Sequence, residues 1–201
     1  VAHFKTACSI PPQNLMKALN GRLPTSVRIK EALEAPLSFH SRFNVVSKTY
    51  RYRILLTPVA SPFIARFAYH YPYSLDQNKM NEAARHFEGE HDFTSFAAAA
   101  TKCHADAEKR PSKQHNKKMG NTREIFRSHL VWRPTSSLLT YEISGNGFLH
   151  HMVRNIVGTL VEVGRGAFEP SDIPRILAAR DRTLAGPTAP AHGLCLWKVE
   201  Y

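Results

Sequence analysis

The sequence predicts an α+β or mixed α/β protein built on a largely antiparallel sheet. Residues 48–56 alternate polar and apolar side chains as a strand does, and two further strand-like runs, 123–132 and 138–144, are separated by a short turn. Apolar residues at helical spacing mark 76–87 and 148–163. Because hairpin-like strand pairs alternate with helices along the chain, we expect helices packed on one sheet, with no firm domain boundary.

The first part of the chain is expected to contribute a strand, a helix and a second strand. VAHFKT, residues 1–6, is strand-like. A Pro-Pro pair then opens a helix around Gln13–Leu19, which Gly21 ends. Val27–Leu33 is rich enough in apolar residues to form another strand.

The run KTYRYRILL, residues 48–56, is the clearest strand in the chain. One face carries Tyr50, Tyr52, Ile54 and Leu56, and the other carries Thr49, Arg51, Arg53 and Leu55. Residues 57–73 are rich in proline and aromatic residues and are expected to form an ordered connection.

Three further helices are predicted after residue 75. Asp76 caps a helix whose apolar positions are Met80, Ala83, Ala84 and Phe87, and Gly89 ends it. In the later helix, 148–163, one apolar stripe contains Leu149, Met152, Val153, Ile156, Val157, Leu160 and Val161. A helix capped by Ser171 then runs to about Arg180, and GLCLWKVEY forms a last strand.

Composition points to a polyanionic partner. Lys and Arg number 27 against 16 acidic residues, which gives a net charge of +11. Nucleic acid is the first interpretation and an anionic membrane the second, with a merely solubilising basic surface as the alternative. The sequence contains no run of 18 apolar residues, so it predicts no membrane-spanning helix. Its three cysteines are far apart, which favours a reducing, cytoplasmic compartment without disulfides.

Arg154 is the residue whose position most needs an explanation. It lies on the flank of the apolar stripe, one turn after His150, where a guanidinium can reach a cleft beside the core. It either holds a carboxylate or phosphate, or it extends its charged end to the surface. Gly158, away from the stripe, would let another backbone or a ligand approach the helix.

Tyrosines interleaved with arginines suit nucleic-acid binding. In KTYRYR the rings of Tyr50 and Tyr52 can stack on bases while Arg51 and Arg53 neutralise phosphates. The alternative is an ordinary strand whose tyrosines pack on the core, and this is about equally favoured for Tyr52 because Ile54 follows on the same face.

Other chemistries receive little support. His150 and His151 are adjacent, so on a helix they would point about 100° apart, and Cys103-His104 has no matching pair for zinc. No phosphate-binding glycine loop or nucleophile signature occurs. Asp92 is most simply a cap and Asp181 an ion-paired residue at a helix end.

Several segments together resemble the bacterial tRNA pseudouridine synthase A family. They are FHSRFNVVSKTYRYRI (39–54), FEGEHDFTSF (87–96), GNGFLHHMVRNIVGTLVEVG (145–164), RDRTLAGPTAPAHGLCLWKVEY (180–201) and, more loosely, NGRLPTSVRI (20–29). They follow the family's order over nearly the whole chain. The basic stretch 102–118, with six Lys or Arg and two acidic residues, is expected to be a loop insertion facing RNA.

The resemblance implies the pseudouridine synthase fold, a mixed and mainly antiparallel sheet flanked by helices, and an isomerase needing no metal or cofactor. An Asp attacks the target nucleotide in the tRNA anticodon stem-loop, and the uracil detaches, rotates and rejoins through C5. Carried over by motif, Tyr50 lies against the flipped base and Arg154 pairs with the Asp. We expect substrate contacts from Tyr50, Lys48, Arg51, Arg53, His151 and Asn155. The resemblance also implies a homodimer.

One departure from the family concerns the nucleophile itself. The family's Asp lies in a Gly-Arg-Thr-Asp motif, ahead of a strand resembling the VAHFKT with which this chain begins. We therefore interpret the chain as the family's catalytic region without its N-terminal segment, and expect it to form no pseudouridine alone. The alternative is a non-catalytic RNA-binding module on the same fold.

Overall fold

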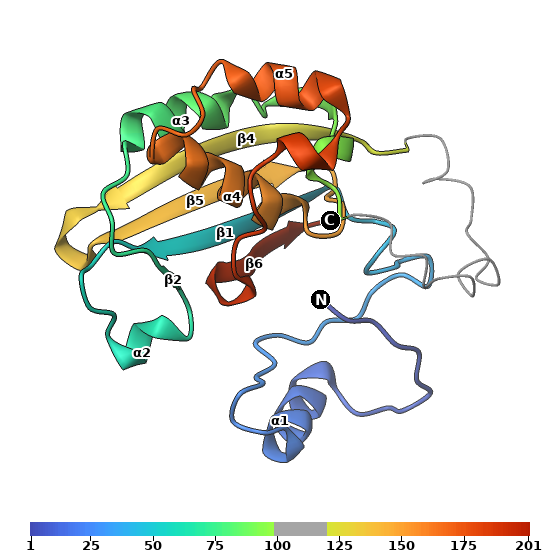
Figure 1. Ribbon diagram of the computed structural model, residues 1–201. Helices are drawn as coiled ribbons and strands as arrows, with labels where there is room; N and C mark the ends of the chain where they lie inside the picture. Colours follow the sequence, from blue (N-terminus) through green and yellow to red (C-terminus); the bar gives the residue numbers. More distant parts are fainter. Residues whose placement is uncertain (99–119) are drawn as a thin grey trace. The chain divides into compact units, whose positions relative to one another are not determined.

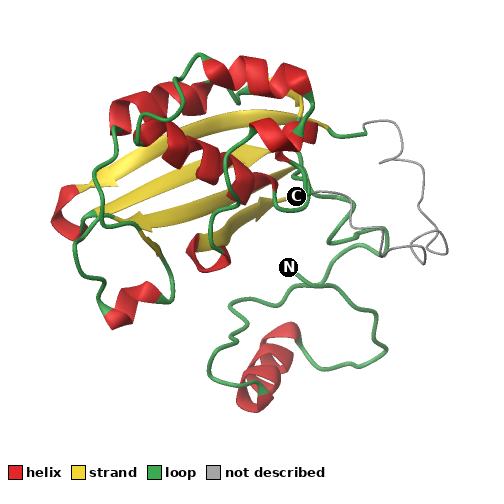
Figure 2. Ribbon diagram, viewed as in Figure 1, coloured by secondary structure: helices red, strands yellow, loops and turns green. Residues whose placement is uncertain are grey.

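The computed structural model describes residues 1–98 and 120–201, and the predicted basic insertion at 102–118 lies outside them (Figures 1 and 2). The chain divides into two compact units. One contains Val1–Val45 with Tyr201, and the other contains Val46–Glu200. Each is described separately below.

The N-terminal unit has one helix and no strand. Helix α1 spans Pro12–Arg22, which confirms the predicted helix, but Gly21 lies inside it and Leu23 follows its end. The predicted strands at 1–6 and 27–33 are wrong. A strand needs a neighbour to pair with, and both segments run as irregular chain without one.

The larger unit is organised around a sheet of six strands, which confirms the predicted α+β class. In spatial order the path is β2-β1-β5-β4-β3, and β6 also pairs with β1. The strands are β1 (Ser47–Leu55), β2 (Tyr69–His70), β3 (Gly89–Asp92), β4 (Thr122–Arg133), β5 (Leu138–Gly145) and β6 (Leu194–Glu200). Among the strands of the described residues, β1 and β2 pair in parallel and all the other pairs are antiparallel. The short β2 and β3, and the one-turn helix α2 (Pro62–Ala65), were not expected from the sequence.

Strand β1 lies inside the sheet and shows the predicted alternation. It pairs with β5 on one side, and with β6 and β2 on the other. Tyr52 and Ile54 are fully buried in the core, whereas Arg51 and Arg53, which alternate with them, remain half-exposed. The two faces of this strand therefore have separate environments.

Three helices gather over one face of the sheet (Figure 1): α3 (Gln77–Arg85), α4 (Met152–Gly164) and α5 (Asp172–Ala179). Asp76 caps α3 as predicted, because its carboxylate accepts a hydrogen bond from the Lys79 amide at 3.0 Å. Phe87 lies beyond the end of α3 but is still buried in the core. Ser171 occupies the N-cap position of α5, but its side chain makes no capping hydrogen bond.

Helix α4 begins four residues later than its sequence pattern suggests. His151 has a left-handed backbone (φ 61°), which interrupts the helical path, and Met152 is the first helical residue. The predicted apolar stripe is otherwise confirmed, since its members from Met152 onward are buried. His150 therefore precedes the helix, so Arg154 is not one helical turn after it.

Candidate active site

Arg154, in the first turn of α4, is held by backbone rather than by an acidic side chain. Its Nε donates to the carbonyl of Ala189 at 2.7 Å, and the Ala189 amide donates to the Arg154 carbonyl at 3.1 Å. Within residues 1–98 and 120–201, its two terminal nitrogens make no hydrogen bond or ion pair. A half-buried guanidinium thus keeps its bidentate end available for an anion.

Tyr52, the second tyrosine of the motif, belongs to the core. It is 0% exposed, and its hydroxyl donates to the Pro190 carbonyl at 2.6 Å. Burial raises the pKa of Tyr52, the nearby Tyr69 raises it further, and the positive charge of Arg154 opposes the shift. Of the two interpretations of this residue, the structure supports packing.

Tyr50 lies two residues earlier on the same face of β1 and is only partly buried. Its ring meets that of Phe148 edge to face, with centroids 5.1 Å apart and planes at 80°. Burial raises the pKa of Tyr50, so its hydroxyl is protonated at neutral pH. Tyr50 can therefore offer both an aromatic surface and a hydrogen-bond donor.

The other basic residues of β1 are divided between the two faces of the sheet. Arg51 alternates to the side opposite Tyr50, where its guanidinium donates to Glu142 and lies 3.9 Å from the ring centre of Trp197. Arg53 shares that side, and Lys48 shares the side of Tyr50. The structure thus separates Arg51 and Arg53 from the tyrosines they flank in sequence.

The two histidines before α4 do not diverge as predicted. Because they precede the helix, the rings of His150 and His151 stack, with centroids 3.9 Å apart and planes at 29°. Burial lowers the pKa of His151, and the positive charges of His150 and Arg154 lower it further. The pair therefore forms a stacked aromatic surface near Arg154, in which the neutral form of His151 is favoured.

Asn155, predicted to contact substrate, is 1% exposed and its amide is fully occupied. Its nitrogen donates to the Phe96 carbonyl at 2.7 Å, and its oxygen accepts from Thr188 at 2.6 Å and from Arg182 at 3.2 Å. These contacts assign Asn155 a structural role beneath the site rather than a place on its surface.

Neither of the two carboxylates singled out in the sequence pairs with Arg154. Asp92 is a cap, as predicted: it accepts from the Thr94 amide at 2.9 Å, and it also pairs with Arg180 at 3.0 Å. Asp181 forms no ion pair among the described residues, contrary to the prediction, and instead accepts from the amide and hydroxyl of Thr183.

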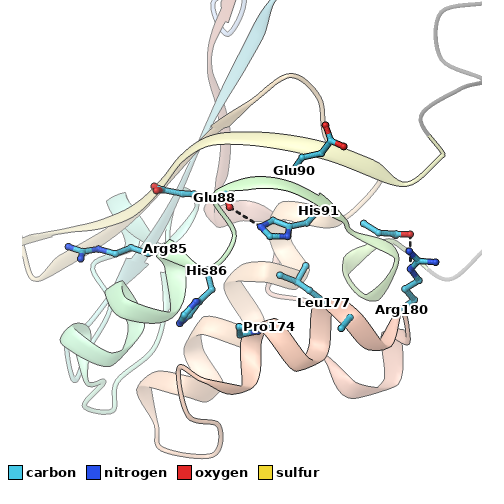
Figure 3. Close-up of a pocket in the computed structure, with 10 residues that line it drawn as sticks. Arg85, His86, Glu88, Glu90, His91, Pro174, Leu177 and Arg180 are labelled. Atoms are coloured by element: carbon cyan, nitrogen blue, oxygen red, sulfur yellow. Dashed lines mark hydrogen bonds and ion pairs between the residues drawn. The ribbon is translucent and has the colours of Figure 1, made fainter.

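A hollow of about 770 Å³, lined in part by Asp92 and Arg180, lies between the end of α3, β3 and α5 (Figure 3). Its charged lining residues are Glu88, Glu90, Asp92, Arg85 and Arg180, of which Asp92 and Arg180 form an ion pair. Because acidic groups outnumber arginines there, the hollow does not favour a polyanion, and none of the predicted site residues lines it.

Among the described residues, no cluster of three or more His, Cys, Asp or Glu side chains is placed to hold a metal ion. No helix in the described part of the chain is long and apolar enough to cross a membrane. The Cys103-His104 pair lies outside the described residues.

Sequence reasoning missed the contribution of residues 182–190. These residues lie against α4 and supply the carbonyls that Arg154 and Tyr52 contact. Gly158 was the one available signal, because its lack of a side chain was expected to admit another backbone. The structure confirms this: a Cβ on Gly158 would lie 1.6 Å from the Pro187 carbonyl oxygen.

Comparison with known proteins gives a consistent result. Residues 83–201 match the family model described as tRNA pseudouridine synthase. Over all 201 residues the chain is 46% identical to tRNA pseudouridine synthase A of Bacillus pumilus, 42% to that of Anoxybacillus flavithermus and 41% to that of Bacillus subtilis. The match spans 74% of the length of each of these relatives.

Proposed function

The chain belongs to the tRNA pseudouridine synthase family, and on this basis we propose that it isomerises uridine to pseudouridine in the anticodon stem-loop of tRNA, with Arg154 and Tyr50 at the reacting nucleotide. The observation that carries the proposal is the state of Arg154. Its Nε is committed to Ala189, while its terminal nitrogens are unpaired among the described residues.

Arg154 would pair with the nucleophilic Asp. The family resemblance locates that Asp in a Gly-Arg-Thr-Asp motif ahead of the segment that corresponds to Val1. A guanidinium beside a carboxylate lowers the carboxylate pKa, so the Asp stays ionised and nucleophilic. Bidentate contact would also orient the carboxylate toward the sugar it attacks.

Tyr50 would lie against the uracil once the target nucleotide has left its stack. Its ring is braced by Phe148 and its hydroxyl is protonated, so it can contact the base by its face or donate a hydrogen bond to it. His151, stacked on His150 near Arg154, would extend this aromatic surface toward a neighbouring base.

Charge supports tRNA binding. The net charge of +11 favours contact with a phosphate backbone. Lys48 shares the face of Tyr50 and would contact the RNA near the target. Arg51 and Arg53, on the opposite face, would contribute to the general positive field, with Arg51 already engaged by Glu142.

We also propose a cytoplasmic homodimer. The sheet face opposite the helices carries Trp197, which is 51% exposed, beside the exposed Phe126. Large apolar groups gathered on one open face are typical of surfaces that a second subunit covers. Light scattering with Trp197→Glu should show a shift toward monomer, and an unchanged mass would argue against this face.

The deciding experiment measures tritium release from tRNA labelled at C5 of uridine, because forming the C5 glycosidic bond expels that hydrogen. We expect release by a form of the protein that extends N-terminal to Val1 and contains the Gly-Arg-Thr-Asp motif, and none by the 201-residue chain alone. Tight tRNA binding without release by the extended form would support the non-catalytic RNA-binding alternative. Release by the 201-residue chain would disprove our assignment of the nucleophile.

A further inference from the structure

We propose that Arg182 is a positioning residue for Arg154, acting through residues 182–190, here called the clasp. Arg182, Thr188 and Asn155 fix the clasp on α4 so that the carbonyl of Ala189 sets the direction of the Arg154 guanidinium. The proposal rests on the function proposed above, because it assigns Arg154 to the reacting centre.

The contacts of Arg182 explain how it shapes the clasp. One terminal nitrogen donates to the carbonyls of Ala185 at 3.2 Å and Gly186 at 2.9 Å. The other donates to Asn155 Oδ1 and Thr188 Oγ1, both at 3.2 Å. All four acceptors are neutral, and among the described residues Arg182 forms no ion pair. A partly buried guanidinium used in this way serves to fold its own loop.

The clasp is pressed closely onto α4. Gly158 lets the Pro187 carbonyl approach the helix, since a Cβ there would lie 1.6 Å from that oxygen. Gly186 also lies close to Thr159, because an added Cβ would lie 2.7 Å from the Thr159 Cα. The Gly186 amide also donates to the Thr159 hydroxyl at 2.9 Å. These backbone contacts therefore fix the position of the clasp on α4.

The far end of the clasp contacts both elements of the proposed site. The Ala189 carbonyl accepts from Arg154 on α4, and the Pro190 carbonyl accepts from Tyr52 on β1. A shift of the clasp would therefore release the guanidinium and disturb the strand that carries Tyr50. Because misplacing a catalytic group by about 1 Å can cost about 100-fold in rate, anchoring at Arg182 affects turnover without touching substrate.

The first test is structural and uses the 201-residue chain. The Arg154 Nε–H signal, assigned in ¹H–¹⁵N spectra by its loss in Arg154→Lys, should be protected from solvent exchange because it donates to Ala189. We expect Arg182→Ala and Thr188→Val to remove this protection, and Thr188→Ser, which keeps the hydroxyl, to preserve it. Retained protection in a folded Arg182→Ala or Thr188→Val variant would overturn the proposal.

The second test measures kcat and its dependence on pH in a form of the protein that contains the Gly-Arg-Thr-Asp motif ahead of Val1. Arg182→Ala and Thr188→Val should lower kcat by about 100-fold while KM changes little, with Thr188→Ser near wild type. The acid limb of kcat should move up by about one pH unit, since a displaced guanidinium no longer lowers the nucleophile pKa. Arg175→Ala, on the exposed side of α5, is the matched control.

The two tests separate failure of the clasp from failure of the proposed function. Lost protection with unchanged kcat and an unshifted acid limb would show that the clasp positions Arg154 but that Arg154 does not serve the nucleophile, which overturns the catalytic half of the proposal. Should Arg182→Ala fail to fold, the uncharged pair Thr188→Val and Thr188→Ser decides both questions. An equal loss of kcat in that pair would overturn the proposal.

Discussion

Arg154 and Ala189 are joined by two reciprocal hydrogen bonds. The Ala189 amide donates to the Arg154 carbonyl at 3.1 Å, and the Arg154 side chain donates back to the Ala189 carbonyl at 2.7 Å. The guanidinium is therefore oriented by backbone before any carboxylate approaches it. Because its anchor is neutral, its full charge remains to act on a partner.

Replacing Arg154 should abolish turnover even when the charge is kept. A lysine has no group that could replace the Nε–H donor to the Ala189 carbonyl, and it cannot bind a carboxylate bidentately. We expect Arg154→Lys and Arg154→Ala both to lower kcat by about 100-fold or more in the tritium-release assay. Near-normal kcat in Arg154→Lys would mean that charge alone suffices and that the geometry with Ala189 is irrelevant.

Tyr50→Phe should affect turnover more than binding. The ring and its edge-to-face contact with Phe148 are kept, and only the hydroxyl is removed. We expect kcat to fall by about 100-fold with tRNA affinity, measured by filter binding, within about threefold. Turnover within a few-fold of wild type would reduce Tyr50 to a stacking surface, and Tyr50→Leu would then show the larger loss.

Gly158→Ala should destabilise the larger unit. The new methyl would lie 1.6 Å from the Pro187 carbonyl oxygen, so the helix or the clasp must shift. We expect a loss of about 3 kcal/mol in the free energy of unfolding, measured in urea. The control is Gly147→Ala, whose methyl would meet only the Arg123 side chain at 3.4 Å. Equal losses in the two variants would contradict the close approach.

His151 should titrate below the ordinary histidine pKa of 6.5. Burial, His150 and Arg154 all disfavour its charged form, so its pKa is lowered. Removing one of these positive charges with Arg154→Gln should raise the His151 pKa toward 6.5, as followed by the imidazole proton shifts in NMR. No change in pKa would show that the guanidinium and the imidazole are farther apart than the structure indicates.

Asp92 should stabilise the fold only while it is ionised. Burial tends to raise its pKa, but hydrogen bonds from Thr94 and the charge of Arg180 outweigh this and lower it below 3.8. The contribution of Asp92 to the free energy of unfolding is therefore complete above pH 3.8, the pKa of an ordinary Asp. It is lost as the pH falls through the lowered pKa that Asp92 has in the folded protein. We expect Asp92→Ala to cost about 1 kcal/mol at pH 7 and progressively less in acid.

The control for Asp92 is Glu90→Gln on the same strand, because Glu90 forms no ion pair among the described residues. The Glu90→Gln variant should have the same free energy of unfolding in urea as the wild type at pH 7. A cost for Asp92→Ala that stays constant between pH 7 and pH 2 would show that the charge of Asp92 is not involved.

The parts of the fold that the sequence predicted well are those coded by local periodicity. Strand β1 and helix α3 follow from the spacing of their apolar residues. Asp76 adds an N-cap, whose partner is the amide of Lys79, three residues later. The failed strand at 1–6 has suitable residues but lacks a pairing partner in its unit, and a pattern within one segment cannot supply a partner.

A residue of the site could be predicted only where its side-chain type is unusual for its place in the sequence pattern. Arg154 stood out as a cation beside an apolar stripe, and the family resemblance supplied its partner. Arg182 did not stand out, because its four acceptors are backbone and side-chain oxygens brought together by folding. The burial of Asn155 was unpredictable for the same reason: it depends on Phe96 and Thr188, both more than 30 residues away.

The place of β1 within the sheet has a consequence for how this gene can change. Tyr50 and Arg51 point to opposite faces, and the strand is hydrogen-bonded on both sides, to β5 along its length and to β6 with an irregularity between Thr49 and Tyr50. Losing or gaining one codon before Tyr50 would exchange the two faces and put a guanidinium under the helices. We therefore expect the site to tolerate a change of residue type in this stretch better than a change of its length.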